Sequence, residues 1–99
     1  MSYDLLTAKE YCVITFNSTQ CALLGEKHLT EKSFDLIVIP TPREISASCG
    51  LALKLFCGDV EKVRRELTGA GINTGGYFLF EKTANGVNVS EVGVDNGQK

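Results

Sequence analysis

Short apolar runs and two helical patterns alternate along the chain. The runs predict strands, because they are rich in β-branched and aromatic residues and are bounded by polar or turn-forming residues. Between them, two segments repeat apolar side chains every three or four positions, which is typical of one face of a helix. The pattern predicts strands over residues 11–16, 34–39, 51–57 and 76–81, and helices near residues 18–32 and 59–69.

The resulting order is strand, helix, strand, strand, helix, strand. This order favours the α+β class and a ferredoxin-like βαββαβ arrangement. Right-handed crossovers then place both helices on one face of a four-stranded antiparallel sheet. Residues 34–39 are almost continuously apolar, which is typical of a strand that is central or covered on both faces. Because large exposed apolar patches are uncommon on monomers, we expect a homodimer or a terminal segment to cover the other face.

The length of 99 residues predicts a single domain. Residues 10–82 are expected to form its core. Asn85-Gly86 is a strong hairpin signal, so residues 83–99 predict a short hairpin followed by a mobile tail. We find no internal repeat and no linker between domains.

Charge and hydropathy argue against nucleic-acid and membrane partners. The formal net charge is −2, and no basic cluster extends beyond Arg64-Arg65, whereas nucleic acid normally meets a basic face. The first residues lack the positive segment and apolar core of a signal peptide. No apolar run approaches the roughly 20 residues of a membrane span. These observations predict a cytoplasmic protein.

The cysteines, at positions 12, 21, 49 and 57, include no Cys-x-x-Cys pair. His28 is the only imidazole, so zinc-ribbon spacing is absent and we expect neither a metal nor a cofactor. In a reducing cytoplasm the thiols are expected to stay free. Cys12 lies within a predicted strand and His28 beside an apolar helix stripe, so we assign both to packing.

The connection between the second and third predicted strands is the unusual segment of the chain. It is far longer than the two to five residues of an ordinary hairpin loop, and loops of this length are usually functional or disordered. Pro40 and Pro42 restrict its backbone, which argues against disorder. Gly50 ends it and allows a sharp turn or the close approach of a ligand.

This segment has the sequence Pro40-x-Pro42-Arg43-Glu44-Ile45-Ser46-x-Ser48-Cys49-Gly50-Leu51-Ala52. It resembles the signature of a family of small bacterial domains described as selenium/sulfur carrier-like. The resemblance extends from about Tyr11 to about Ile72, and Ala47 stands where a serine is more usual. It implies that Cys49 carries the chalcogen.

The predicted topology brings this loop to the end of the molecule where the first helix begins. Cys49 should therefore lie near the helix N-terminus, which Asn17 or Ser18 caps. The positive end of a helix and the guanidinium of Arg43 both favour a thiolate. The candidate anion-binding residues are Ser46, Ser48, Gly50 and Ser18. The alternatives are that Arg43 pairs with Glu44, or another nearby acid, to hold the loop, and that the loop serines satisfy only loop backbone groups.

Cys21 falls in the first turn of the first helix, on the stripe that faces the sheet. Periodicity and topology therefore predict that Cys21 and Cys49 are near neighbours, close to the separation that a disulfide needs. Two roles are open for Cys21: a resolving thiol for Cys49, or a side chain that fills a gap beneath the loop. Cys12 and Cys57 are expected to be poorer partners for Cys49.

Two functions fit these residues. The first is a sulfur or selenium carrier that takes the atom from a donor protein and passes it to an acceptor thiol protein, as an accessory protein rather than a stand-alone enzyme. The second is a non-catalytic binding or regulatory module that holds a small anion at the loop and the helix N-terminus. Ferredoxin-like domains host many unrelated functions, so the fold alone does not separate the two.

Overall fold

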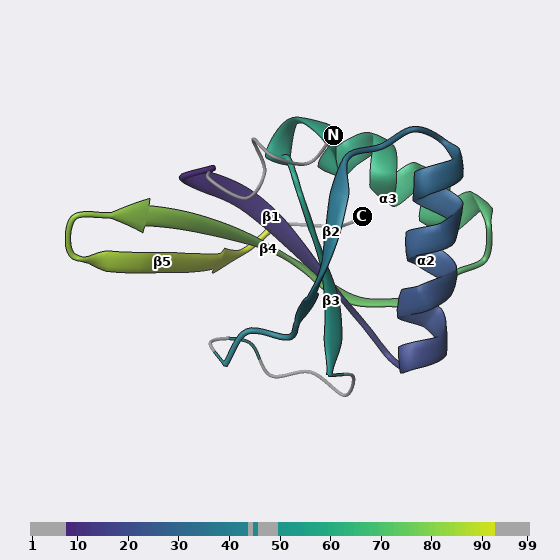
Figure 1. Cartoon of the computed structure of the whole chain (residues 1–99), viewed down its shortest axis with the longest axis horizontal. Helices are drawn as coiled ribbons and strands as arrows, with labels where there is room; N and C mark the ends of the chain where they lie inside the picture. Colours follow the sequence, from purple (N-terminus) through teal and green to yellow (C-terminus); the bar gives the residue numbers. More distant parts are fainter. Residues whose placement is uncertain (1–7, 44, 46–49, 93–99) are drawn as a thin grey trace.

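The computed structural model describes residues 8–43, 45 and 50–92 of the chain. They form a mixed structure of strands and helices (Figure 1). In chain order the elements are β1 (Glu10–Phe16), α2 (Thr19–Glu31), β2 (Leu36–Pro40), β3 (Leu51–Leu55), the 3₁₀ turn η1 (Cys57–Asp59), α3 (Val60–Gly69), β4 (Thr74–Thr83) and β5 (Gly86–Glu91). Within the described ranges, no helix is long and apolar enough to cross a membrane.

The strands form one antiparallel sheet in the order β2-β3-β1-β4-β5. The α+β class is confirmed, but the prediction of four strands is wrong, because the described residues contain five. The fifth strand follows a tight turn in which Thr83 pairs with Gly86, and Gly86 has a φ of 130° that favours glycine. The Asn85-Gly86 signal therefore marks a full strand pairing.

Both helices pack on the same face of the sheet. Alternate residues of β1, namely Cys12, Ile14 and Phe16, are buried there with apolar side chains of β3, β4 and both helices. Helix α2 lies close to the sheet because it presents Gly25, where a Cβ atom would lie 3.1 Å from the ring of Phe16. The apolar period of residues 18–32 places Ala22, Leu24 and Leu29 on the stripe that faces the sheet. Ala22 and Leu29 are buried as this period predicts, but Leu24 is 49% exposed, so the prediction is wrong for Leu24.

The opposite face has its own buried cluster, formed by Val13, Ala52, Phe80 and Ile45. Ile45 comes from the long loop between β2 and β3, so this loop supplies part of the cover. The sequence analysis had expected the cover from a terminal segment or from a second copy. A homodimer stays a prediction.

The apolar run at residues 34–39 was misleading about position. Strand β2 is at the edge of the sheet, and Val38 is 38% exposed. Pro40 is compatible with this place, because an edge strand has a side on which no ladder hydrogen bond is needed.

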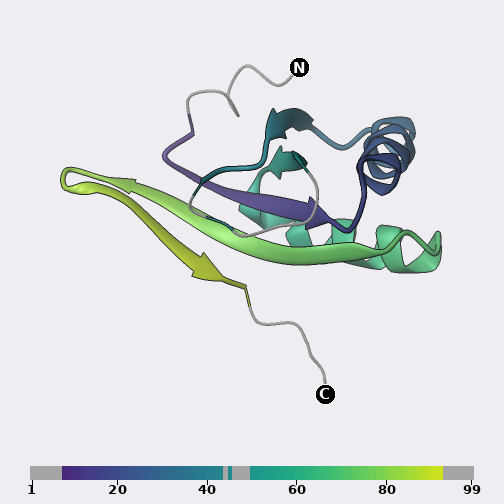
Figure 2. The same cartoon turned by 90° about the horizontal axis from the view of Figure 1, so that it is seen from below.

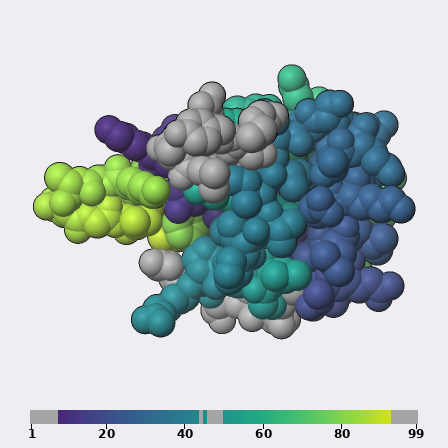
Figure 3. Space-filling view, viewed as in Figure 1, coloured from purple at the N-terminus to yellow at the C-terminus, as the bar shows by residue number. Residues whose placement is uncertain are grey.

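The third strand is shorter than expected and ends at Leu55, since Cys57 already belongs to η1. At the other side of the sheet, the β4–β5 hairpin extends past the rest of the molecule (Figure 2). The same hairpin forms the yellow-green projection in the space-filling view (Figure 3).

Leu29→Ala tests the contribution of the helix-covered core. Leu29 is fully buried in α2, so its truncation should lower the free energy of unfolding by about 2–5 kcal/mol. Leu23→Ala on the same helix is the matched control, because Leu23 is 51% exposed and its truncation should change stability by no more than about 0.5 kcal/mol. Urea denaturation followed by circular dichroism measures both. Equal losses for the two variants would contradict the described packing of α2.

Candidate functional site

The loop between β2 and β3 is closed at its base. Pro40 pairs with Leu51 across the last register position of the two strands. Immediately beyond them, the backbone N–H of Thr41 donates to the carbonyl of Gly50 over 2.9 Å. The two ends of the loop are therefore fixed to each other before its central residues begin.

Ile45 anchors the loop to the sheet. Its backbone N–H donates to the carbonyl of Pro42 over 2.9 Å, which forms a tight turn. Its side chain is buried against Val13, Ala52 and Phe80 on the face that carries no helix. The sequence analysis assigned Ile45 no role, although a single apolar residue within a polar loop is a signal for such an anchor.

The predicted site residues fall into two groups. Cys49, Ser46 and Ser48 lie outside the described residues. Arg43 and Gly50 are described, and both are exposed. A Cβ atom built on Gly50 would meet no atom of the described residues within 4 Å, so this part of the structure leaves space beside the end of the loop.

Ser18 is the N-cap of α2, as predicted. It has an extended backbone, and its Oγ accepts a hydrogen bond from the backbone N–H of Cys21 over 3.1 Å. Cys21 is a free, half-buried thiol that packs against the helix-covered core. Both residues therefore belong to the first turn of the helix, where backbone N–H groups concentrate positive potential.

The base of the loop and the start of α2 lie at the same end of the sheet. Thr15 of β1 pairs with Ala52 of β3, so the antiparallel register carries Gly50 toward the point where β1 leads into Ser18. The first turn of α2 and the N-terminal end of β3 share the lower edge of the molecule in Figure 1.

A second pair of cysteines lies at the other end of β3. The Sγ of Cys12 donates a hydrogen bond to the Sγ of Cys57, with 3.0 Å between the sulfur atoms. Cys12 is 2% exposed, as its packing role predicts, and Cys57 is half-buried. The sequence analysis missed this contact. The predicted pairing of the first and third strands was a usable signal, but the turn that carries Cys57 toward β1 was not anticipated.

Both thiols of this pair resist ionisation. Burial raises the pKa of Cys12, and the hydrogen bond to Cys57 together with the charges of Cys57 and Glu10 acts in the same direction. Burial also raises the pKa of Cys57, but the hydrogen bond from Cys12 lowers it. The hydrogen bond that Cys12 donates therefore stabilises the thiolate of Cys57.

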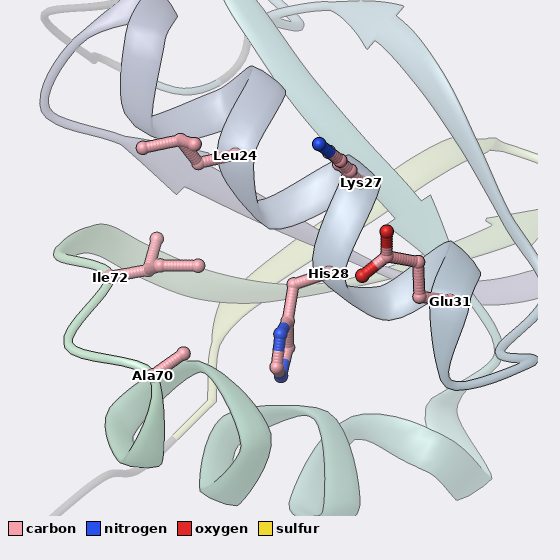
Figure 4. A pocket seen from close by; sticks show the side chains of 6 residues that line it. All are labelled: Leu24, Lys27, His28, Glu31, Ala70 and Ile72. Carbon is pink, nitrogen blue, oxygen red and sulfur yellow. The ribbon is translucent and has the colours of Figure 1, made fainter.

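His28 joins the two helices instead of serving the loop. Its Nε2 lies 3.1 Å from Oε1 of Glu66, so it links α2 to α3. It also lines a pocket of about 250 Å³ beside Leu24, Ala70 and Ile72, with Lys27 and Glu31 at its margin (Figure 4). These residues belong to the middle and the last turns of α2 and to the chain after α3, beyond the first turn that Ser18 caps. The assignment of His28 to a structural contact agrees with this geometry.

Lys54 is the one buried cation among the residues that the structure describes. Its Nζ lies 4.2 Å above the ring of Tyr11, which stacks on Phe80. A cation above an aromatic face is stabilised by the ring quadrupole. No set of three or more His, Cys, Asp or Glu residues in the described part of the chain is arranged to hold a metal ion.

Ser18→Ala tests the N-cap beside the loop. Loss of the Oγ acceptor should lower the free energy of unfolding by about 1 kcal/mol, because the N–H of Cys21 loses its partner. Ser18→Asp is the control, since its carboxylate keeps an acceptor at the cap and should retain most of the stability. Urea denaturation of both variants measures the difference. A stable Ser18→Ala protein and an unstable Ser18→Asp protein would contradict the assigned cap.

The free energy of unfolding should fall as the pH rises above about 9, the ordinary pKa of a cysteine. In the folded chain the pKa of Cys12 is raised, so the unfolded chain loses this proton first and alkaline pH favours unfolding. The contribution of the protonated Cys12 thiol to the free energy of unfolding is complete below pH 9 and is lost above it. Cys12→Ala should show a smaller fall between pH 8.5 and pH 10 in urea denaturation, by roughly 1 kcal/mol.

Burial and Lys82 lower the pKa of Lys54, which acts with the opposite sign in the same pH range. Lys54 is present in both proteins, so its effect cancels in the difference. Identical pH profiles for the wild type and Cys12→Ala would contradict the described burial of this thiol.

Comparison with known proteins gives one family. The model of the family described as "Putative Se/S carrier protein-like" matches residues 11–86, well over half of the chain. The match includes all of β1 except Glu10, both helices, β4 and the complete loop between β2 and β3. Comparison with curated proteins gave no match, and comparison with solved structures gave none either. The chain belongs to the Se/S carrier protein-like family.

Proposed function

We propose that this chain carries sulfur or selenium on Cys49, as a persulfide or perselenide, between a donor protein and an acceptor thiol protein. The family match is the observation that carries the proposal, because its span includes the whole loop that contains Cys49. The chain acts as an accessory carrier and needs partners for both steps.

The surroundings of the loop support this chemistry. The base of the loop lies at the end of the sheet where α2 begins, and the first turn of a helix favours negative charge. The exposed guanidinium of Arg43 adds a positive charge. The described residues leave space beside Gly50 for the sulfur of a partner. In this proposal Ser46 and Ser48 hydrogen-bond the anion, and Ser18 holds the helix start in place.

Loading is a sulfur transfer between thiolates. The thiolate of Cys49 attacks the terminal sulfur of a donor persulfide, so a new S–S bond forms on Cys49. The S–S bond of the donor breaks, and the donor leaves as a thiolate. An acceptor thiolate then attacks the terminal sulfur in the same way and releases Cys49 as a thiolate. Each transfer exchanges one persulfide for another without net oxidation or reduction, so no external oxidant is needed.

Cys21 is proposed as the resolving thiol. It lies in the first turn of α2, half-buried and free. Its thiolate attacks the inner sulfur of the Cys49 persulfide, which closes a Cys21–Cys49 disulfide and releases hydrosulfide. A reductant must then restore both thiols before the next cycle.

Cys49→Ser tests the carrier. The full chain is incubated with glutathione persulfide and its mass is measured without reductant. The wild type should gain the mass of one or more sulfur atoms on the peptide that contains Cys49, and Cys49→Ser should gain none there. Arg43→Ala should lower the alkylation rate of Cys49 at pH 7 by up to about tenfold, which corresponds to one pKa unit.

Cys21→Ser is the matched control, because it keeps Cys49 and removes the proposed resolving thiol. It should hold the added sulfur longer than the wild type and form no disulfide with Cys49. A Cys49 thiol that gains no sulfur and is alkylated with the pH profile of an ordinary cysteine would overturn the carrier and favour the anion-binding module.

A further inference from the structure

The contact between Cys12 and Cys57 is closer than packing alone requires. Non-bonded carbon atoms are most stable about 3.5–4.0 Å apart, and sulfur is larger than carbon. The two sulfur atoms are 3.0 Å apart, although the residues are 45 positions apart in the sequence. This separation is about 1 Å longer than a disulfide bond. The two sulfur atoms therefore have to approach by only about 1 Å to reach bonding distance.

The fold creates this contact where β3 ends. Cys12 pairs with Leu55 in the register of β1 and β3, and Cys57 follows two positions later. Phe56 has the last extended backbone before η1 begins at Cys57. Both cysteines join the helix-covered core, so their side chains lie on the same side of the sheet.

We propose that Cys12 and Cys57 form a dithiol site that a low-molecular-weight disulfide oxidises to an intramolecular disulfide. This site lies at the C-terminal end of β3, whereas the loop between β2 and β3 joins its N-terminal end. The site does not depend on the proposed role of Cys49. Cys57 is the entry point, because it is half-buried whereas Cys12 is enclosed.

The reaction takes place in two exchanges. The Cys57 thiolate attacks one sulfur of the small disulfide, forms a mixed disulfide and expels the first small thiolate. Cys12 then loses its proton to that thiolate, attacks the Cys57 sulfur and expels the second one. The protein loses two protons and two electrons, and the electrons reduce the small disulfide to two small thiols, so the small disulfide is the oxidant.

The hydrogen bond gives the exchanges this order. Cys12 donates to Cys57, which favours the thiolate on Cys57. The charges that face the pair come from Glu10 of β1 and Glu81 of β4, and they act against ionisation of Cys57. The exchange should therefore become faster as the pH rises.

The test uses the full chain with Cys21→Ser and Cys49→Ser, so that Cys12 and Cys57 are the remaining thiols. The chromogenic disulfide dithiobis(nitrobenzoate) is added to the folded protein. We expect two coloured thiolates per chain and a final mass lower by two hydrogen atoms. A peptide map should show Cys12 joined to Cys57, and the melting temperature should rise on oxidation, because the bond closes a long loop.

Two further variants in this background test the order. With Cys12→Ala, one coloured thiolate should appear and a nitrobenzoate adduct should stay on Cys57. With Cys57→Ala, the folded chain should react at least tenfold more slowly than in denaturant, because Cys12 is enclosed. Circular dichroism confirms that each variant is folded. A final product with adducts on both cysteines, or a pair that stays reduced while denatured chain reacts, overturns the proposal.

Discussion

Strand β1 must be covered on both faces. Its residues from Cys12 to Phe16 are at most 2% exposed, although their side chains alternate between the two sides of the sheet. Hydrogen bonds to β3 and β4 occupy both of its edges. The helices can cover only one face, because both pack on the side of Ile14 and Phe16. The long loop between β2 and β3 is therefore a structural part of the protein as well as its candidate site, since Ile45 helps to enclose Val13.

The two ends of β3 differ in solvent exposure and therefore in the environment that they provide for a thiol group. At its N-terminal end the chain is exposed at Gly50, close to the first turn of α2. At its C-terminal end Cys57 contacts Cys12 within an apolar core, where burial opposes a thiolate. An exposed end of the loop is compatible with the proposed exchange between Cys49 and partner proteins. The buried end is compatible with the proposed thiol pair, which would react slowly with small molecules and be shielded from larger reactants.

Local patterns in the sequence predicted most of the elements. β1, β3 and both helices follow from apolar periodicity, and Ser18 follows from the preference of caps for serine. Periodicity could not show that Leu24 is exposed, because the stripe on α2 is wider than its contact with the sheet. Nor could composition show that β2 is an edge strand, because its apolar residues resemble those of a central one.

For the candidate site, the sequence could suggest which residues take part but not how they are arranged in space. The resemblance implied Cys49 and the charge of the guanidinium suggested Arg43, and both roles stay predictions. The predicted topology brought the loop base to the start of α2. The Cys12–Cys57 contact depends on how η1 turns after Phe56, which is a matter of tertiary geometry and leaves no periodic trace in the sequence. The anchoring of Ile45 was missed for a similar reason, since the space that it fills is formed by three separate strands.

The packing of Ile45 limits which substitutions the protein tolerates at the residues around it. Ile45, Val13, Ala52 and Phe80 share one buried volume, so the side chains at these four positions cannot vary independently. A bulkier residue at Ala52 displaces Ile45 unless Ile45 or Phe80 becomes smaller. A substitution in the strands at this cluster therefore also affects how the loop is anchored. A graft of the loop alone onto another sheet would lack the buried surface against which Ile45 packs.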